Sequence, residues 1–333
     1  MATTSVGNVH VNVPLSNLAI RYMPLMDGFI ADEVCPRIPV VNESNVYYTW
    51  QQADFFSVDV SDLVPDRGTP REIDFTATTA SYSANRRELG WTISQRERNN
   101  ADNQLDLETA KQQGVLARLA LLRDQRVAAL LKAGGTTTVL GEIITGGLDS
   151  SMTAAANPKF DVSTTLWSDF TGQVTVGIRA MRQTIGVRPN TLIIPAYVAE
   201  GMQKSGIFTA AGGPINQYTG TPADNAYFDQ YPLLPTSIMG MRVLVPGNIK
   251  NTAKEGQTAS YSDVWGKDVT LLYVTPGPSM TVPSVSYTFQ AEPLLTRQAR
   301  DDVRRMDEYF LGNTIAEKVV APFAGYTITA AAT

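Results

Sequence analysis

The residue types that most often perform nucleophilic or acid–base chemistry are scarce in this chain. It has one histidine, His10, and one cysteine, Cys35, and both lie in a proline-punctuated N-terminal stretch. A Ser-His-Asp or Cys-His nucleophile needs such a residue next to a base, and a structural zinc site needs about four ligands. We therefore expect no catalytic residue, no cofactor site and no metal site.

Phosphate-binding motifs are missing as well. Gly266-Lys267 is followed by Asp268 and lacks the earlier glycine of a P-loop, and no strand–GxGxxG–helix unit occurs. A conventional enzyme is disfavoured, and an α/β enzyme of unfamiliar chemistry is kept only as a further alternative.

One strongly charged span carries carboxylates that a metal or acid–base site could use. They alternate with arginines, so ion pairing is the simpler interpretation. Because both signs are interleaved, the span suits a sheet surface that faces solvent or a neighbouring subunit. Its residues are Arg297, Arg300, Asp301, Asp302, Arg304, Arg305, Asp307 and Glu308.

Composition indicates a globular chain with one large or two ordinary domains. Of 333 residues, 43% are hydrophobic and 18% are charged. The net charge of −5 gives no global basic signal for nucleic-acid binding. The single cysteine excludes an intrachain disulfide, which fits synthesis in the cytosol. No secretory signal and no transmembrane helix are expected, since the first residues lack a basic-then-apolar pattern and no apolar run approaches about 18 residues.

The longest regular pattern predicts a helix over about residues 101–132, roughly 45 Å long. Its apolar residues recur at three- and four-residue steps and form one stripe, while most of its charged residues are expected outside that stripe. Glu108 and Lys111 are spaced to form a favourable pair. The stripe comprises Leu105, Leu116, Leu119, Ala120, Val127, Leu130 and Leu131, and the charged set comprises Arg118, Arg123, Asp124 and Arg126.

The ends and the middle of this helix carry recognisable signals. Asp102 or Asn103 can cap its start, and Gly134-Gly135 stops its end. Gly114 interrupts the helix at a cost of about 1 kcal/mol relative to alanine. This glycine indicates either a closely packed neighbour or a bend.

An aromatic-rich pattern before the helix predicts a long β-hairpin. Residues 46–58 are strand-like, residues 73–79 alternate with period two, and a charged tip lies between them. A two-stranded ribbon is marginal alone and would expose an apolar patch, so it should lie either on its own domain core or on another molecule. The aromatics are Tyr47, Tyr48, Trp50, Phe55 and Phe56, and the tip charges include Asp66, Arg67, Arg71 and Glu72.

The remaining segments predict an arm and a mixed lobe. Residues 1 to about 45 contain four prolines and predict an extended arm on other surfaces, with a short helix in 29–36. The alternative is a disordered tail, which the apolar residues of the stretch argue against. The other predicted elements are strand 86–94, short strands in 134–165, helix 167–185 ended by Gly186, strand 191–194, helix 195–204, a loop over 206–235, strands 241–245 and 269–274, and alternating strands in 284–329.

Three short segments, taken with the order of all these elements, carry a resemblance to a known family. They are RELGWTIS at 87–94, TLIIP at 191–195, and KVVA at 318–321 before AGYTI at 324–328. The whole chain resembles the Hong Kong 97-type major capsid proteins of tailed phages. The resemblance implies an α+β fold with an N-terminal arm, an extended β-hairpin (the E-loop), a long spine helix, a peripheral-domain sheet and an α/β axial domain.

The resemblance also implies a division of the chain and a role for it. The implied role is a structural capsid protein without enzymatic activity, forming pentamers and hexamers of an icosahedral or prolate shell around double-stranded DNA. An encapsulin-like nanocompartment shell is the alternative. The implied parts are the arm at 1–45, the E-loop at 46–90, the peripheral domain with its spine helix at 91–165, the axial domain at 166–280, and C-terminal strands at 281–333 that return to the peripheral domain.

The implied partners are further copies of the chain, a scaffolding protein, a portal and a decoration protein. DNA would be enclosed without sequence-specific binding, no membrane would be involved, and assembly would take place in the host cytoplasm before incorporation into the virion. No lysine lies between Val46 and Lys111, so a lysine cross-link from the hairpin is not expected. The expected intersubunit contacts are the hairpin aromatics and tip charges named above, with Arg297, Arg300, Asp301, Arg304 and Arg305.

Overall fold

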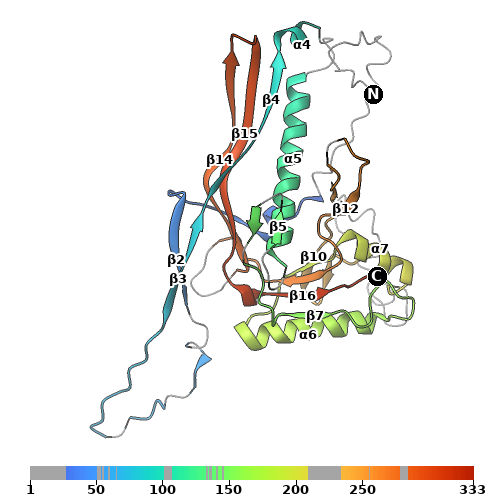
Figure 1. Ribbon diagram of the computed structural model, residues 1–333. Helices are drawn as coiled ribbons and strands as arrows, with labels where there is room; N and C mark the ends of the chain where they lie inside the picture. Colours follow the sequence, from blue (N-terminus) through green and yellow to red (C-terminus); the bar gives the residue numbers. More distant parts are fainter. Residues whose placement is uncertain are drawn as a thin grey trace.

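Two β-sheets joined by one long helix organise the chain (Figure 1). In this computed structural model the described residues are 28–333 except 51–53, 55, 59–60, 65, 101–106, 133, 135–136, 140–141, 145, 209–233, 255 and 278–283. His10, Asp102, Asn103 and Leu105, and most of the predicted loop at 206–235, lie outside the described residues.

The first sheet has four strands in the order β1-β14-β15-β4. Its centre is a long antiparallel hairpin, in which Arg300 faces Asp307 near the tip. The predicted strand at 86–94 and the part of the pattern at 284–329 that forms β14 and β15 are confirmed here, and the charged span forms the far end of the hairpin. The strands are β1 (Arg37–Pro39), β14 (Ser286–Asp301), β15 (Met306–Val319) and β4 (Asn85–Ser94).

Helix α5 (Leu107–Leu130) runs along this sheet and follows the short helix α4 (Gln95–Asn100) (Figure 1). Its 24 described residues make it about 36 Å long, and the first six residues of the predicted helix lie outside the described residues. The predicted stripe is confirmed, because Val127 and Leu130 are buried with Leu131, while Leu116, Leu119 and Ala120 are partly buried.

The charged residues of α5 were expected largely outside the stripe, and for three of them this prediction is wrong. Arg123 is 6% exposed, Asp124 is fully buried and Arg126 is 8% exposed. The reason is that α5 is covered on more than one side, since it contacts β15 and β4 as well as helix α2 (Ala31–Val34). Only Arg118 is exposed as expected.

The predicted pair of Glu108 and Lys111 does not form. Lys111 instead approaches Glu97 of α4 at 3.7 Å, and Glu108 pairs with Arg98. The preceding helix thus supplies partners that lie nearer to both side chains than they lie to each other. These pairs fasten α4 to the start of α5.

Helix α2 confirms the short helix predicted in 29–36. Ile30, Ala31, Val34 and Cys35 are all buried in the main core. The described end of the predicted arm therefore belongs to the chain's own core, and the strand after it, β1, pairs in parallel with β14.

The second sheet has six strands in the order β7-β16-β13-β8-β10-β9, and α6 (Trp167–Ile185) runs along it (Figure 1). Helix α7 (Ala196–Ser205) follows β8. Gly186, at a φ of 72°, ends α6 as predicted, because this left-handed conformation suits glycine. The strands are β7 (Thr153–Ala155), β16 (Gly325–Thr329), β13 (Val269–Leu272), β8 (Thr191–Ile193), β10 (Met241–Leu244) and β9 (Ser237–Ile238).

The last strand, β16, lies in a different sheet from the other C-terminal strands. β14 and β15 lie in the four-stranded sheet, but β16 does not. It lies between β13 and β7, with Leu271 facing Tyr326. The short 3₁₀ helix Pro322–Ala324 turns the chain from one sheet to the other.

Three two-stranded hairpins complete the described structure. In the predicted long hairpin, the second strand begins at Ala77 and not at Ile73, because the amide of Thr76 bonds to the Asp54 side chain (2.7 Å). Among the described residues, no helix is long and apolar enough to span a membrane. The hairpins are β2 (Ser44–Trp50) with β3 (Ala77–Ser83), β5 (Thr137–Val139) with β6 (Glu142–Ile144), and β11 (Ile249–Asn251) with β12 (Tyr261–Asp263).

Two glycines give opposite predictions for the same substitution. Gly312 of β15 faces Glu88 of β4, and a Cβ there would lie 2.8 Å from the Glu88 Cα and would overlap the Arg87 carbonyl. Gly312→Ala should lower the free energy of unfolding by about 1–3 kcal/mol. No described residue lies within 4 Å of such a Cβ on Gly114, so the closely packed neighbour suggested for it is wrong within the described part of the chain, and Gly114→Ala should raise stability by about 1 kcal/mol.

Denaturant unfolding of the two variants beside the wild type measures both effects. Equal stabilities for the two variants would contradict the packing described for β15 and β4.

Candidate intersubunit surfaces

The β2–β3 ribbon is anchored to its own chain on one face. Tyr47 of β2 lies 5.6 Å from Phe289 of β14 between ring centroids, and Tyr82 of β3 stacks on the same ring at 4.4 Å. Tyr82 also donates a hydrogen bond to the Asn42 carbonyl oxygen (3.1 Å). Tyr47, predicted as an intersubunit residue, therefore serves first to hold the root of the ribbon on β14.

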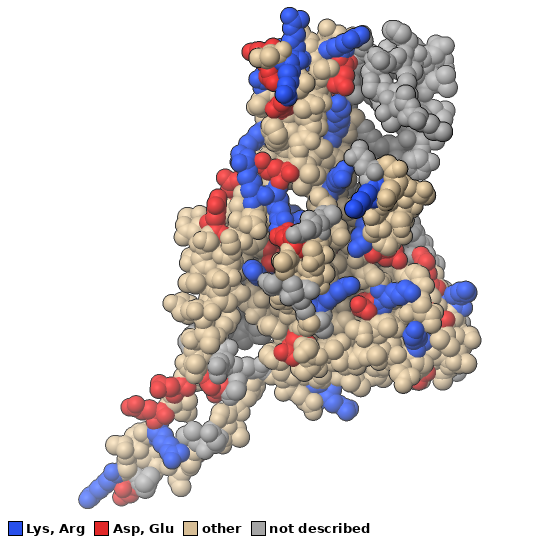
Figure 2. All heavy atoms as spheres, viewed as in Figure 1, with Lys and Arg blue, Asp and Glu red and all other residues tan. Residues whose placement is uncertain are grey.

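The other face of the ribbon is free of these contacts. Strand alternation turns Val46 and Tyr48 away from Phe289, and they are 55% and 71% exposed. On the anchored face, beyond Tyr47, the hydroxyls of Thr49 and Thr78 hydrogen-bond across the strands at 2.8 Å. Neither strand contains a charged residue, and Figure 2 shows the corresponding region as an uncharged surface below the charged upper part of the molecule.

Beyond the ribbon, the chain extends from residue 51 to residue 76 and exposes further apolar side chains, including Val58, Leu63 and Ile73. Phe56 is exposed but lies beside the end of α6, where a Cβ on Gly186 would be 3.2 Å from its ring. The tip charges Asp66, Arg67, Arg71 and Glu72 are all exposed, whereas the side chains of Trp50 and Phe55 lie outside the described residues.

The charged span at the end of the β14–β15 hairpin is paired within the chain. Arg300 contacts Asp302 at 2.9 Å and Asp307 at 3.1 Å, and Arg304 approaches Asp301 at 3.7 Å. This confirms the ion-pair interpretation of these carboxylates, and no metal-binding group of carboxylates, histidines or cysteines occurs among the described residues.

The remaining two arginines of this span, Arg297 and Arg305, differ in whether they form ion pairs. Arg297 reaches back to Glu292 (3.5 Å) and Glu88 (3.8 Å). Arg305 adopts a left-handed backbone conformation (φ 51°), and its carbonyl oxygen accepts the amide of Gln95 (3.0 Å). Its exposed side chain has no ion pair with a described residue. Of the predicted contact arginines here, Arg305 is the one left available.

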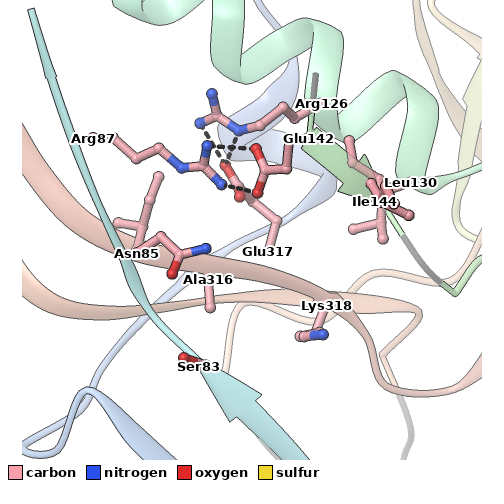
Figure 3. Close-up of a pocket in the computed structure, with 12 residues that line it drawn as sticks. Ser83, Asn85, Arg87, Arg126, Leu130, Glu142, Ile144, Ala316, Glu317 and Lys318 are labelled. Carbon is pink, nitrogen blue, oxygen red and sulfur yellow. Dashed lines mark hydrogen bonds and ion pairs between the residues drawn. The ribbon is translucent and has the colours of Figure 1, made fainter. Parts of the chain in front are cut away.

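Two neighbouring ion pairs, which the sequence did not indicate, line one pocket, where one joins β4 to β6 and the other joins α5 to β15 (Figure 3). Arg87 of β4 binds Glu142 of β6 through two hydrogen bonds of 2.5 Å, and Arg126 of α5 binds Glu317 of β15 at 2.9 Å. The bonds from Arg87 lower the pKa of Glu142, despite its partial burial. These residues line a cavity of about 200 Å³ that Lys318 also borders.

A second charged contact seats α2 on α5. Arg123 forms an ion pair with Asp32, and its guanidinium also donates to the Cys35 carbonyl (3.3 Å) and the Thr288 hydroxyl (3.2 Å). Burial opposes ionisation of Asp32, but the hydrogen bonds and charges of Arg37 and Arg123 lower its pKa overall. One arginine thus connects α2, α5 and β14.

Asp124, the next residue on α5, connects a different set of elements. Its carboxylate accepts the Trp265 indole N–H at 2.7 Å and the Ile30 amide at 3.3 Å. Burial raises the pKa of Asp124 to about 6, and these hydrogen bonds and Arg123 only partly offset that rise. The carboxylate caps the start of α2 and joins it to Trp265, which lies between β12 and β13.

Sequence comparison finds a curated relative in a phage. The chain is 25% identical to the major capsid protein of Pseudomonas phage JBD67 over 266 residues, which is 79% of this chain and 77% of that protein. No protein-family model matches the chain.

Solved structures share the fold over nearly the whole chain. A phage-related protein from Bordetella bronchiseptica RB50 matches with a TM-score of 0.61 at 19% identity, covering 96% of this chain and 97% of that one. The mature capsid of bacteriophage PhiM1 matches with a TM-score of 0.57 at 13% identity, covering 98% and 91%. A protein of Microbacterium phage Oxtober96 matches with a TM-score of 0.60 at 12% identity, covering 99% and 96%.

The buried carboxylate of Asp124 predicts a specific pH dependence of stability. A folded-state pKa of about 6 against 3.8 means that the fold disfavours the ionised form by about 3 kcal/mol. That penalty is fully present above pH 6 and is relieved as the pH falls towards 4. Between pH 7 and pH 5 the free energy of unfolding should therefore gain about 1 kcal/mol from this group.

Urea unfolding of Asp124→Asn at the two pH values tests this prediction, because the variant cannot titrate and should lose that gain. Asp302→Asn, at an exposed position, is the matched control and should keep it. An unchanged gain in Asp124→Asn would contradict the assignment.

Proposed function

We propose that this chain, a structural protein of a phage capsid shell with the Hong Kong 97-like fold, forms pentamers and hexamers that close around double-stranded DNA. In this role it acts without catalytic activity. The shell, icosahedral or prolate, is assembled in the host cytoplasm with a scaffolding protein and a portal, and a decoration protein can bind outside. The DNA is held without sequence-specific contacts, which fits the chain's net charge of −5.

The observation that carries this proposal is the β2–β3 ribbon and the segment beyond it. A two-stranded ribbon is marginal in water by itself, yet this one extends away from both large sheets (Figure 1). The contacts of Tyr47 and Tyr82 on its anchored face hold only the root of the ribbon in place. Its free face presents Val46 and Tyr48 with no neighbouring charge in either strand, the composition of a surface that is buried by a partner.

The partner that we propose for this face is a neighbouring copy of the chain. The exposed tip residues Asp66, Arg67, Arg71 and Glu72 would form polar contacts beside the apolar ribbon contact, and Arg305, at the far end of the β14–β15 hairpin, would form a separate one. Exposed ion pairs contribute only about 0–1 kcal/mol each. These groups would therefore determine how two neighbouring copies align more than how tightly they bind. Repetition of the same contact around a closed shell makes modest pairwise energies sufficient.

Electron microscopy of the expressed chain, alone and with its scaffolding protein, tests assembly. Capsomers, tubes or shells support the proposal, and persistent monomers under both conditions would refute it. Packaged double-stranded DNA distinguishes a phage head from a nanocompartment, which would co-purify with a protein cargo.

The free face of the ribbon gives a sharper prediction. Replacing Val46 and Tyr48 by serine should leave a folded subunit, since both side chains are exposed, but should remove about 2 kcal/mol or more from each ribbon contact. Shells should then be absent in negative-stain images while circular dichroism is unchanged. Val162→Ser, at an exposed loop position away from the ribbon, is the control and should assemble. Normal shells from the double variant would show that this face does not bind a neighbour.

A further inference from the structure

A second cavity, distinct from the one in Figure 3, lies between α2, α5 and the β14–β15 hairpin. Its volume is about 100 Å³, and its polar lining is dominated by guanidinium groups. The charged residues around it are Arg37, Arg87, Arg123 and Arg126, with Asp32 as the one carboxylate. A space of this size is far larger than a single water needs.

The carboxylates that neutralise two of these arginines lie on the other side. Glu142, the partner of Arg87, and Glu317, the partner of Arg126, line the first cavity and not the second. Both arginines line both cavities, whereas their carboxylate partners line only the first. With four arginines and one aspartate, the lining of the second cavity carries more positive than negative charge.

Two N–H groups of these arginines have no acceptor. The Nε atoms of Arg87 and Arg123 are buried and make no hydrogen bond to any described residue. Arg123 as a whole is only 6% exposed. A buried donor without a partner costs about 1–3 kcal/mol, so an acceptor with negative charge would be strongly favoured at this place.

We propose that this cavity binds a phosphate-sized oxyanion. Planar guanidinium forks match the oxygens of phosphate and sulfate and bind them more strongly than neutral donors do. The Asn313 side chain adds a polar group to the lining, and Phe29 and Leu116 supply apolar walls that reduce screening by water. The oxyanion is free inorganic phosphate or a phosphate of the DNA backbone, which share this chemistry.

Isothermal titration calorimetry of the purified full-length chain with inorganic phosphate, at constant ionic strength, tests the proposal. Saturable binding at one site per chain is expected. Arg123→Lys removes the fork but keeps the charge, and Ala120→Leu fills part of the cavity, which Ala120 lines, without touching any charge. Each should weaken phosphate binding at least about tenfold, a change of about 1.4 kcal/mol.

Arg118→Gln is the matched control, because Arg118 is exposed on the same helix and does not line the cavity. It should bind phosphate like the wild type. Absence of saturable binding in the wild type, or equal affinity in Ala120→Leu and the wild type, would overturn the proposal and leave only water in the cavity. Competition by a short DNA duplex would assign the oxyanion to DNA, and its absence would assign it to free phosphate; either result supports the site.

Discussion

The rest of the structure depends on how two adjacent residues of α5 hold the short helix α2. Arg123 pairs with Asp32 from one side, and Asp124 caps the start of α2 through the Ile30 amide while it binds Trp265. Charges buried in this way are costly unless they are paired and hydrogen-bonded. Because these two residues point in different directions, the N-terminal segment, the long helix and the six-stranded sheet have one mutual arrangement and share one continuous core.

The parts of the fold that the sequence predicted are those governed by local rules. Helix α6 occurs where its apolar spacing and Gly186 place it, and the ribbon and the β14–β15 hairpin follow their period-two patterns. The buried charges of α5 could not be predicted in the same way. Arg123 lies 91 residues from Asp32, and Arg126 lies 191 residues from Glu317, so periodicity within the helix carries no information about either partner.

The sequence predicted which types of residue form the candidate surface better than it predicted which way their side chains face. Aromatic residues in β2 indicated a contact, but only the structure separates Tyr47, which faces Phe289, from Tyr48, which faces outward. Arginines near the end of β14 also suggested contacts, yet Arg297 and Arg300 are satisfied within the chain. The two extremities of the molecule therefore differ: at the end of the β14–β15 hairpin most charges are paired within the chain and Arg305 is the exception, whereas the other extremity carries an uncharged ribbon with exposed charges beyond it.

The position of β16 has a consequence for how the chain is made. This strand, at 325–329, lies between β7 and β13 and pairs with both. A ribosome must therefore synthesise almost the whole given sequence before the six-stranded sheet can be completed. Contacts between segments so far apart form slowly, so nascent and prematurely terminated chains lack a finished sheet. A strand from near residue 325 in the interior of the sheet therefore makes the sheet depend on contacts between segments that are far apart in the sequence.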